Sequence, residues 1–194
     1  MHVKRAGVDG YRSRAVYKLQ EIDRRDRLMV PGSVVLELGA APGGWTQYVA
    51  QRVGERGRIV ASDLLEVDPV AGMTFVQGDF TEQATADRIE VALGEDGADL
   101  VLSDMAPNLT GVAGTDQARS MALAELAMDM AVAVLRPGGS FVVKVFQGEG
   151  FDGFVKALRE PFRSVKVRKP EASRSRSREV YLVASGAAGH SSGA

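Results

Sequence analysis

The sequence lacks cysteine and has very little histidine. Its 194 residues include no Cys and only two His, His2 and His190, each close to a chain end. Disulfides, thiolate metal sites and cysteine nucleophiles are therefore excluded, and we expect neither a bound metal nor histidine catalysis. Any catalytic chemistry is left to Lys, Asp, Glu and the backbone.

Long apolar runs are also missing. No stretch approaches the roughly 18 apolar residues of a membrane span, and residues 1–14 are polar and basic, unlike a signal peptide. We expect a soluble, cytoplasmic, monomeric protein without membrane contact. Its length suits one domain, which we place at residues 1–184. The Gly-, Ala- and Ser-rich tail, residues 185–194, is expected to be disordered.

The net charge of −1 hides a separation of charge along the chain. Residues 1–27, the N-terminal segment with the first helix, carry eight Lys and Arg against four Asp and Glu. Residues 156–194 carry nine against three, whereas residues 28–155 carry seven against 18. Two solvated basic faces and one polyanion-binding surface fit these counts equally well. The second requires that the fold bring both chain ends to one side.

Short β-rich runs alternate with helical patterns, which predicts an α/β fold with a mainly parallel sheet. The predicted strands are 34–38, 58–62, 74–77, 99–103, 140–146, 164–168 and 179–184. The predicted helices run from an N-cap at Ser13 to Leu28 and over 45–52, 81–93, 116–135 and 151–158. The last two strands have a short connection without room for a crossover helix, so this pair should be antiparallel.

A Gly-rich turn, residues 37–45 (ELGAAPGGW), follows the first predicted strand. Its glycines let the backbone approach a ligand closely, and the next helix offers free N–H groups at its start. The spacing Gly-x-x-x-Gly-Gly differs from both the dinucleotide fingerprint and the P-loop. A nicotinamide oxidoreductase is therefore disfavoured.

Three carboxylates end the next strands in order: Asp63, Asp79 and Asp104. Ligands of open parallel sheets bind at this edge, where Asp63 could accept hydrogen bonds from ribose hydroxyls. Asp79 could accept one from an adenine amino group, and Asp104 could lie near a cationic centre. Such a set suits a nucleoside with an amino acid and a sulfonium better than a polyphosphate. A turn or helix cap is the alternative for each Asp alone, and Trp45 fits either the core or a cofactor pocket.

Lys144 interrupts the apolar run FVVKVF, residues 141–146. A lysine that snorkels from an edge strand is one interpretation. The other is a functional amine, for which partial burial and a second cation favour the neutral form while nearby carboxylates favour the charged form. The sequence alone does not decide this balance.

Five long motifs stand out: YRSRA (11–15) with Lys18 and Leu19, LGAAPGGW (38–45), SDMAPN (103–108), GGSFVVKVFQ (138–147) and SRSREVY (175–181). Together they resemble the FtsJ-type family of bacterial 23S ribosomal RNA uridine-2′-O-methyltransferases, and the resemblance covers about residues 10–184. The resemblance implies a Rossmann-like class I methyltransferase with a seven-stranded, mostly parallel sheet, an antiparallel last strand and helices on both faces. It also implies S-adenosylmethionine as cofactor and S-adenosylhomocysteine as product. The cofactor contacts that it implies are Gly43, Trp45, Asp63, Asp79 and Asp104.

The same resemblance implies a catalytic tetrad of Lys18, Asp104, Lys144 and Glu179. A ribose hydroxyl is a poor nucleophile, so methyl transfer needs in-line positioning and removal of one proton. We hypothesise that Lys144 is the general base, that Asp104 and Lys18 orient it and the hydroxyl, and that Glu179 holds the lysines. The implied substrate is a uridine of 23S rRNA in the assembled large subunit.

The two basic segments would then form a rim around this site that binds RNA phosphates. Its candidate members are Lys4, Arg5, Arg12, Arg14, Lys166, Arg168, Lys169, Arg174, Arg176 and Arg178. Alternatives stay open. Base N-methylation is disfavoured because Asn108 occupies the place of a stacking aromatic. A cap- or transfer-RNA 2′-O-methyltransferase would share the tetrad. A non-catalytic RNA chaperone would need neither the three strand-end carboxylates nor Lys144.

Overall fold

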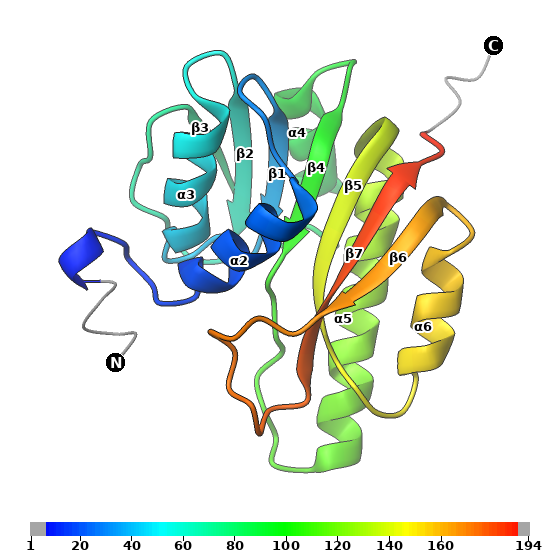
Figure 1. Cartoon of the computed structure of the whole chain (residues 1–194). Helices are drawn as coiled ribbons and strands as arrows, with labels where there is room; N and C mark the ends of the chain where they lie inside the picture. The colour runs from blue at the N-terminus through cyan, green and yellow to red at the C-terminus, as the bar shows by residue number, and fades with distance from the viewer. Residues whose placement is uncertain (1–6, 190–194) are drawn as a thin grey trace.

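The computed structural model describes residues 7–189. Their strands form one seven-stranded sheet in the order β3-β2-β1-β4-β5-β7-β6 (Figure 1). The strands are β1 Val34–Leu38, β2 Arg58–Asp63, β3 Met73–Gln77, β4 Ala98–Ser103, β5 Leu135–Phe146, β6 Phe162–Arg168 and β7 Glu179–Ala187. Strands β1 to β5 pair in parallel, whereas β7 is antiparallel to both β5 and β6. The predicted α/β fold with an antiparallel last strand is confirmed.

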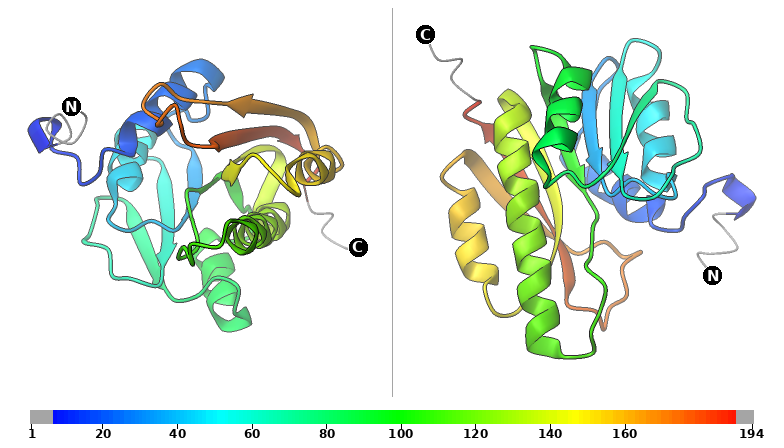
Figure 2. Two further views of the ribbon diagram at one scale, coloured as in Figure 1. Left: turned by 90° about the horizontal axis from the view of Figure 1, so that it is seen from below. Right: turned by 180° about the vertical axis from the view of Figure 1, so that it is seen from behind.

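Helices cover both faces of the sheet. They are α2 Val16–Asp26, α3 Gly44–Val53, α4 Gln83–Leu93, α5 Ala113–Val134 and α6 Phe151–Leu158. Helices α2 and α3 pack their apolar side chains on one face, and α4, α5 and α6 pack on the other (Figure 2). Strand β1 is buried along its whole length, as expected for a central parallel strand. Within residues 7–189, each helix is too short or too polar to span a membrane.

The chain reverses its direction of winding between β1 and β4, which are neighbours in the sheet. At such a switch point the loops after the two strands separate, and a crevice opens at the carboxyl ends of the strands. Figure 1 shows three segments at this lower edge: α2, the loop over residues 104–112 and the loop over residues 169–178. The fold thus places the functional candidates of both chain ends at one edge.

The start of the first long helix differs from the prediction. Ser13 is not its N-cap, because α2 begins at Val16 after Ala15, whose side chain makes no capping hydrogen bond. Ser13 lies in the preceding turn, where its Oγ accepts a hydrogen bond from the Ala15 N–H at 3.1 Å. The Ser13 backbone also lies close to Gly44, so the Gly-rich turn, rather than a cap, fixes the position at which the chain enters α2.

The expected disorder from Ser185 onward is wrong for residues 185–187. Strand β7 continues to Ala187, and Ser185 and Ala187 pair with Ser164 and Phe162 of β6. Ala187 is buried and packs in the apolar core, which explains why small residues remain ordered here. Residues 190–194 lie outside the described part of the chain. At the other junction, β5 begins at Leu135 rather than at Ser140, since Leu135 already pairs with Ala98.

Candidate active site

The four residues of the expected tetrad come together as two ion pairs. Lys18 of α2 contacts Glu179, the first residue of β7, with 2.8 Å between Nζ and Oε1. Lys144 of β5 lies 3.4 Å from Asp104, measured from Nζ to Oδ1, at the end of β4. All four side chains are less than 20% exposed. Residues 161 positions apart in the chain thus share one partly dehydrated site.

Asp104 has a second partner besides Lys144. Tyr181, which is fully buried on β7, donates a hydrogen bond from its hydroxyl to Asp104 Oδ1 at 2.6 Å. Burial raises the pKa of Asp104 above its ordinary value, although Lys144, the Tyr181 hydrogen bond and Lys18 act in the lowering direction. Sequence reasoning gave Tyr181 no role. The available signal was its position two residues after Glu179, which puts both side chains on the same side of β7.

Glu179 is held by groups from two directions. The Ser173 hydroxyl donates to Glu179 Oε1 at 3.1 Å, beside the bond from Lys18. Burial acts to raise the pKa of Glu179, but the hydrogen bond and charge of Lys18, the charge of Lys144 and the Ser173 bond outweigh it, so the pKa is lowered. Glu179 is therefore a stable anion that fixes Lys18 at the edge of the site.

A cavity of about 600 Å³ lies next to the tetrad, within the size range of small-molecule sites. Its lining residues are Gly39, Ser62, Asp63, Leu64, Gly78, Asp79, Phe80, Thr81, Met105, Ala106, Pro107, Asn108, Arg119, Ala122, Leu123 and Leu126. They come from the ends of β1, β2, β3 and β4 and from one side of α5. The expected contacts Asp63 and Asp79 thus line one cavity together.

Both aspartates also serve the backbone. Asp63 accepts hydrogen bonds from the Ala41 N–H at 2.8 Å and the Leu65 N–H at 3.0 Å, so it ties the Gly-rich turn to the end of β2. Asp79 Oδ1 accepts from the N–H and hydroxyl of Thr81. The turn-forming role that sequence reasoning weighed for each Asp is therefore real, and it coexists with a place on the cavity wall.

Ser62 provides an independent sign of a ligand. This residue is 2% exposed and lines the cavity. Among the described residues, its Oγ is a buried polar side-chain atom without a hydrogen-bond partner. An unpaired buried hydroxyl costs free energy, which a polar group bound in the cavity would recover. The cavity therefore fits a ligand that carries hydrogen-bonding groups.

Gly43 lies outside the cavity wall, under a basic side chain. Its φ of 111° needs glycine, and a Cβ there would come within 2.6 Å of Arg12 Nη1. Arg12 donates to the carbonyls of Pro42, Asp68 and Pro69 and so clamps the Gly-rich turn. A contact between Gly43 and a cofactor stays a prediction.

Trp45 is a core residue at the back of the site. It is 3% exposed, its Nε1 donates to the Ala15 carbonyl at 2.8 Å, and its ring lies 5.9 Å from that of Tyr181. A small hollow of about 30 Å³ is lined by Trp45 together with Asp104 and Glu37. Trp45 therefore supports the Asp104–Tyr181 pair from behind, and its expected contact with a cofactor stays a prediction.

Glu37 was missed as a site residue, although it places a carboxyl group within the otherwise apolar strand β1. It is 3% exposed, and its carboxyl accepts a hydrogen bond from the Thr46 hydroxyl. Burial, with smaller contributions from the charges of Asp104 and Asp63, raises its pKa to about 8. At neutral pH, Glu37 is therefore mostly an uncharged acid between the tetrad and the large cavity.

Replacing Glu37 by Gln should stabilise the fold most at alkaline pH. Between the ordinary pKa of 4.5 and about 8, the unfolded chain loses the proton of Glu37 while the native state keeps it. The contribution of Glu37 to the free energy of unfolding of the wild type is therefore complete below about pH 4.5, and it falls as the pH rises to about 8. Gln accepts the same Thr46 bond but does not ionise. Thermal unfolding at pH 4.5, 6 and 8 should show a difference that grows with pH; a constant difference would contradict the assignment.

The loop that carries the C-terminal arginines is docked on α2. Glu21 accepts the backbone N–H groups of Glu171 and Ala172 at 2.6 and 3.0 Å. Arg168 is paired with Asp26 at 2.8 Å, and both side chains are largely buried. These contacts bring the two basic segments of the sequence to one edge (Figure 1).

Fewer basic residues are available to the expected rim than the charge counts of the sequence suggest. Arg12 and Arg168 are used in the internal contacts above, and Lys169 donates to the carbonyls of Ser177 and Glu179. These three residues are therefore structural. Lys169 is nevertheless exposed, as are five expected members that are not used in these contacts: Arg14, Lys166, Arg174, Arg176 and Arg178. Lys4 and Arg5 lie outside the described residues.

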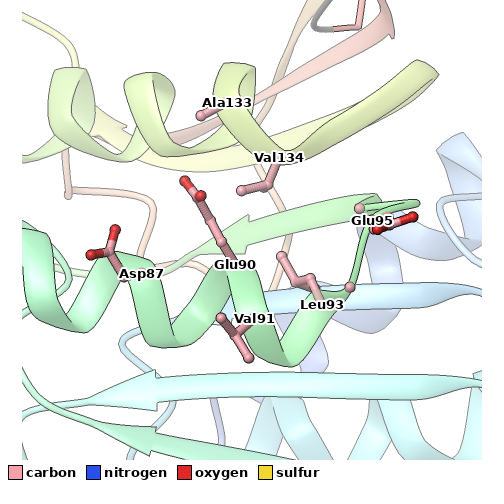
Figure 3. Close-up of a pocket in the computed structure, with 9 residues that line it drawn as sticks. Asp87, Glu90, Val91, Leu93, Glu95, Ala133 and Val134 are labelled. Atoms are coloured by element: carbon pink, nitrogen blue, oxygen red, sulfur yellow. The ribbon is translucent and has the colours of Figure 1, made fainter. Parts of the chain in front are cut away.

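A second large hollow, of about 570 Å³, lies between α4 and α5 (Figure 3). Asp87, Glu90 and Glu95 give it an acidic lining, and its other side is formed by Ala133 and Val134 at the end of α5. It lies near the starts of β4 and β5, at the opposite edge from the tetrad. Its charge would repel a polyanion, so we do not assign it to the active site.

The comparison with known protein families decides the relationship. A family model described as FtsJ-like methyltransferase matches residues 11–187. The chain belongs to the FtsJ-like methyltransferase family. The predicted family and enzyme class are thereby confirmed.

Relatives in this family match the chain over nearly its full length. A protein of Azoarcus sp. is 62% identical over 182 residues, which cover 94% of this chain and 89% of the relative. One of Marinobacter nauticus is 60% identical over 184 residues, covering 95% and 89%. Both are named ribosomal RNA large subunit methyltransferase E. A structure described as a ribosomal RNA methyltransferase of Plasmodium falciparum superposes with a TM-score of 0.83 at 27% identity, covering 93% of this chain and 100% of that one.

Proposed function

We propose that this FtsJ-like methyltransferase transfers a methyl group from S-adenosylmethionine to the 2′-hydroxyl of a uridine in 23S rRNA. The paired side chains Lys144–Asp104 and Lys18–Glu179 beside the large cavity carry the proposal. The names of the relatives support ribosomal RNA as the substrate. Following the family, we propose the assembled large subunit as the form that is recognised and a monomer as the active unit; a cytoplasmic location stays a prediction.

The residues present fit S-adenosylmethionine. Asp63 and Asp79 would hold its ribose and adenine, and the unpaired Ser62 hydroxyl would meet one of its polar groups. Asp104 would lie toward its cationic part. When bound, this cofactor supplies a methyl group that is already activated by the charge on sulfur.

The protein's own task is to prepare the ribose hydroxyl. Lys144 would accept the hydroxyl proton, as a general base must lie within hydrogen-bond reach of it. Asp104 holds Lys144 at 3.4 Å and is itself fixed by Tyr181. Lys18, anchored by Glu179, would orient the hydroxyl from α2. Positioning of this kind supplies much of the rate in reactions that join two bound groups.

Methylation assays on parallel substrates test the proposal. The protein and labelled cofactor are incubated with undermethylated large subunits, free rRNA and transfer RNA, and the products are digested to nucleosides. We expect 2′-O-methyluridine from the large subunits. Base-methylated nucleosides, or no transfer although calorimetry shows bound cofactor, would refute it.

The exposed arginines of the 169–178 loop should bind RNA phosphates. Arg174→Ala with Arg176→Ala should weaken RNA binding and reduce the slope of log affinity against log salt by roughly 0.7–0.9 per lost contact. The matched control is Arg159→Ala with Arg163→Ala, two exposed arginines that lie together in another hollow, with Pro137 and Gly138. Fluorescence titrations at several salt concentrations measure both slopes. Equal slopes in the two double variants would argue against the rim.

A further inference from the structure

A smaller hollow of about 290 Å³ adjoins the large cavity near the tetrad. Its lining residues are Pro107, Leu109, Gly111, Ala113, Asp116, Gln117, Ser120, Phe146 and Arg178. Three of these residues are close in sequence to members of the tetrad. Phe146 comes two residues after Lys144, and Arg178 directly precedes Glu179. Pro107 lines both the hollow and the large cavity, so the two spaces meet beside Asp104.

The walls of this hollow are fixed by hydrogen bonds. Asp116 of α5 accepts the N–H and hydroxyl of Thr110 at 2.8 and 2.7 Å and the Gly111 N–H at 3.2 Å, which holds the loop over residues 104–112. Gln117 is buried and donates to the carbonyls of Phe146 and Glu149 at 2.9 and 3.0 Å. The space is therefore preformed between the loop, α5 and the end of β5.

The lining combines apolar surface with hydrogen-bond donors. Leu109 is 78% exposed, so its place in the fold does not depend on packing in the core. Pro107 adds apolar surface, whereas Arg178 and Ser120 bring donors. This combination suits a flat, partly apolar ring that carries carbonyl oxygens. At about 290 Å³, the hollow has about half the volume of the large cavity of about 600 Å³, which suits a single base rather than a whole cofactor.

We propose that this hollow binds the base of the nucleotide whose ribose is methylated, and that it favours a single-ring pyrimidine. The inference rests on the proposed function, because the ribose must lie at Lys144 while the cofactor occupies the large cavity, which leaves the adjoining hollow for the base. Sequence-specific recognition of RNA uses unstacked bases, which proteins stack against side chains and bind by hydrogen bonds at the base edges. Arg178 and Ser120 would then donate to the carbonyl oxygens of uracil.

Filling the hollow tests this inference. Ala113→Trp places a large side chain at its rim from an exposed position, and Ala118→Trp is the matched control at an exposed position of the same helix outside the lining. Methyl transfer is measured on undermethylated large subunits that carry either the natural uridine or a purine at the target. For Ala113→Trp we expect a fall of about tenfold or more in kcat/KM on uridine, the size of one lost base contact. Cofactor affinity and melting temperature should stay unchanged, and Ala118→Trp should behave as wild type.

The purine substrate separates the base from the RNA backbone. Wild type should lose about tenfold on the purine, whereas Ala113→Trp should lose little more than it already has. Ser120→Leu fills the hollow from its inner wall and should give the same pattern. Wild-type rates in both filled variants, or an unchanged penalty for the purine, would overturn the inference while the proposed function stands. Absence of ribose methylation by wild type would instead refute the proposed function.

Discussion

Replacing Lys144 by Met should lower methyl transfer by about 10²–10⁴-fold, the usual contribution of a general acid or base. The Lys144 amine lies 3.4 Å from Asp104, and the Lys144 side chain is 12% exposed. The residues on either side of it in the run FVVKVF of β5 are apolar. Met keeps the length and packing of the side chain and removes only the group that accepts the proton. Cofactor affinity, measured by calorimetry, should change little, because the large cavity does not include Lys144.

A lysine on α6 provides the control. Lys156 is exposed and belongs neither to the tetrad nor to the expected rim, so Lys156→Met removes an amine but not one from the site. It should keep the wild-type rate. Lys144→Ala leaves room for a small added alkylamine, which should restore part of the rate and should raise it more at higher pH, where more amine is neutral. Near-native transfer by either Lys144 variant, with intact cofactor binding, would remove Lys144 from the role of base.

The strands and the carboxyl-end edge could be predicted because parallel strands make apolar runs and polar residues stand out at their ends. Asp63, Asp79 and Asp104 each follow such a run, as Lys144 interrupts one. The same rule applied to β1 would have found Glu37, whose carboxyl is the ionisable group in a strand of Val and Leu.

Charge counting could not separate binding arginines from structural ones. Arg12 and Arg168 look like Arg174 and Arg176 in the sequence, yet the first two are held by carbonyls and by Asp26. Which arginine is used inside depends on contacts between residues up to 142 positions apart, and a single sequence does not contain these pairings. The order of residues 185–187 was missed for a related reason, since composition indicates disorder but pairing with β6 outweighs it.

Replacing Asp104 by Asn should lower methyl transfer by about 10²–10³-fold, the range seen when one group that stabilises developing charge is removed. Asn can still accept the Tyr181 hydroxyl, but it carries no charge to hold Lys144 or to face a cationic ligand. Because Asp104 is proposed to serve both the hydroxyl and the cofactor, this variant should also weaken cofactor binding, whereas Lys144→Met should not. The comparison separates the two roles of the tetrad.

A second variant at the same position isolates the hydrogen bond. Asp104→Ala also leaves the buried Tyr181 hydroxyl without its acceptor, so its free energy of unfolding should be lower than that of Asp104→Asn by about 1–3 kcal/mol. Denaturant unfolding measures this difference, and Asp129→Asn, an exposed change on α5, should match wild type. If Asp104→Asn bound the cofactor as tightly as wild type and lost only rate, Asp104 would act on Lys144 alone.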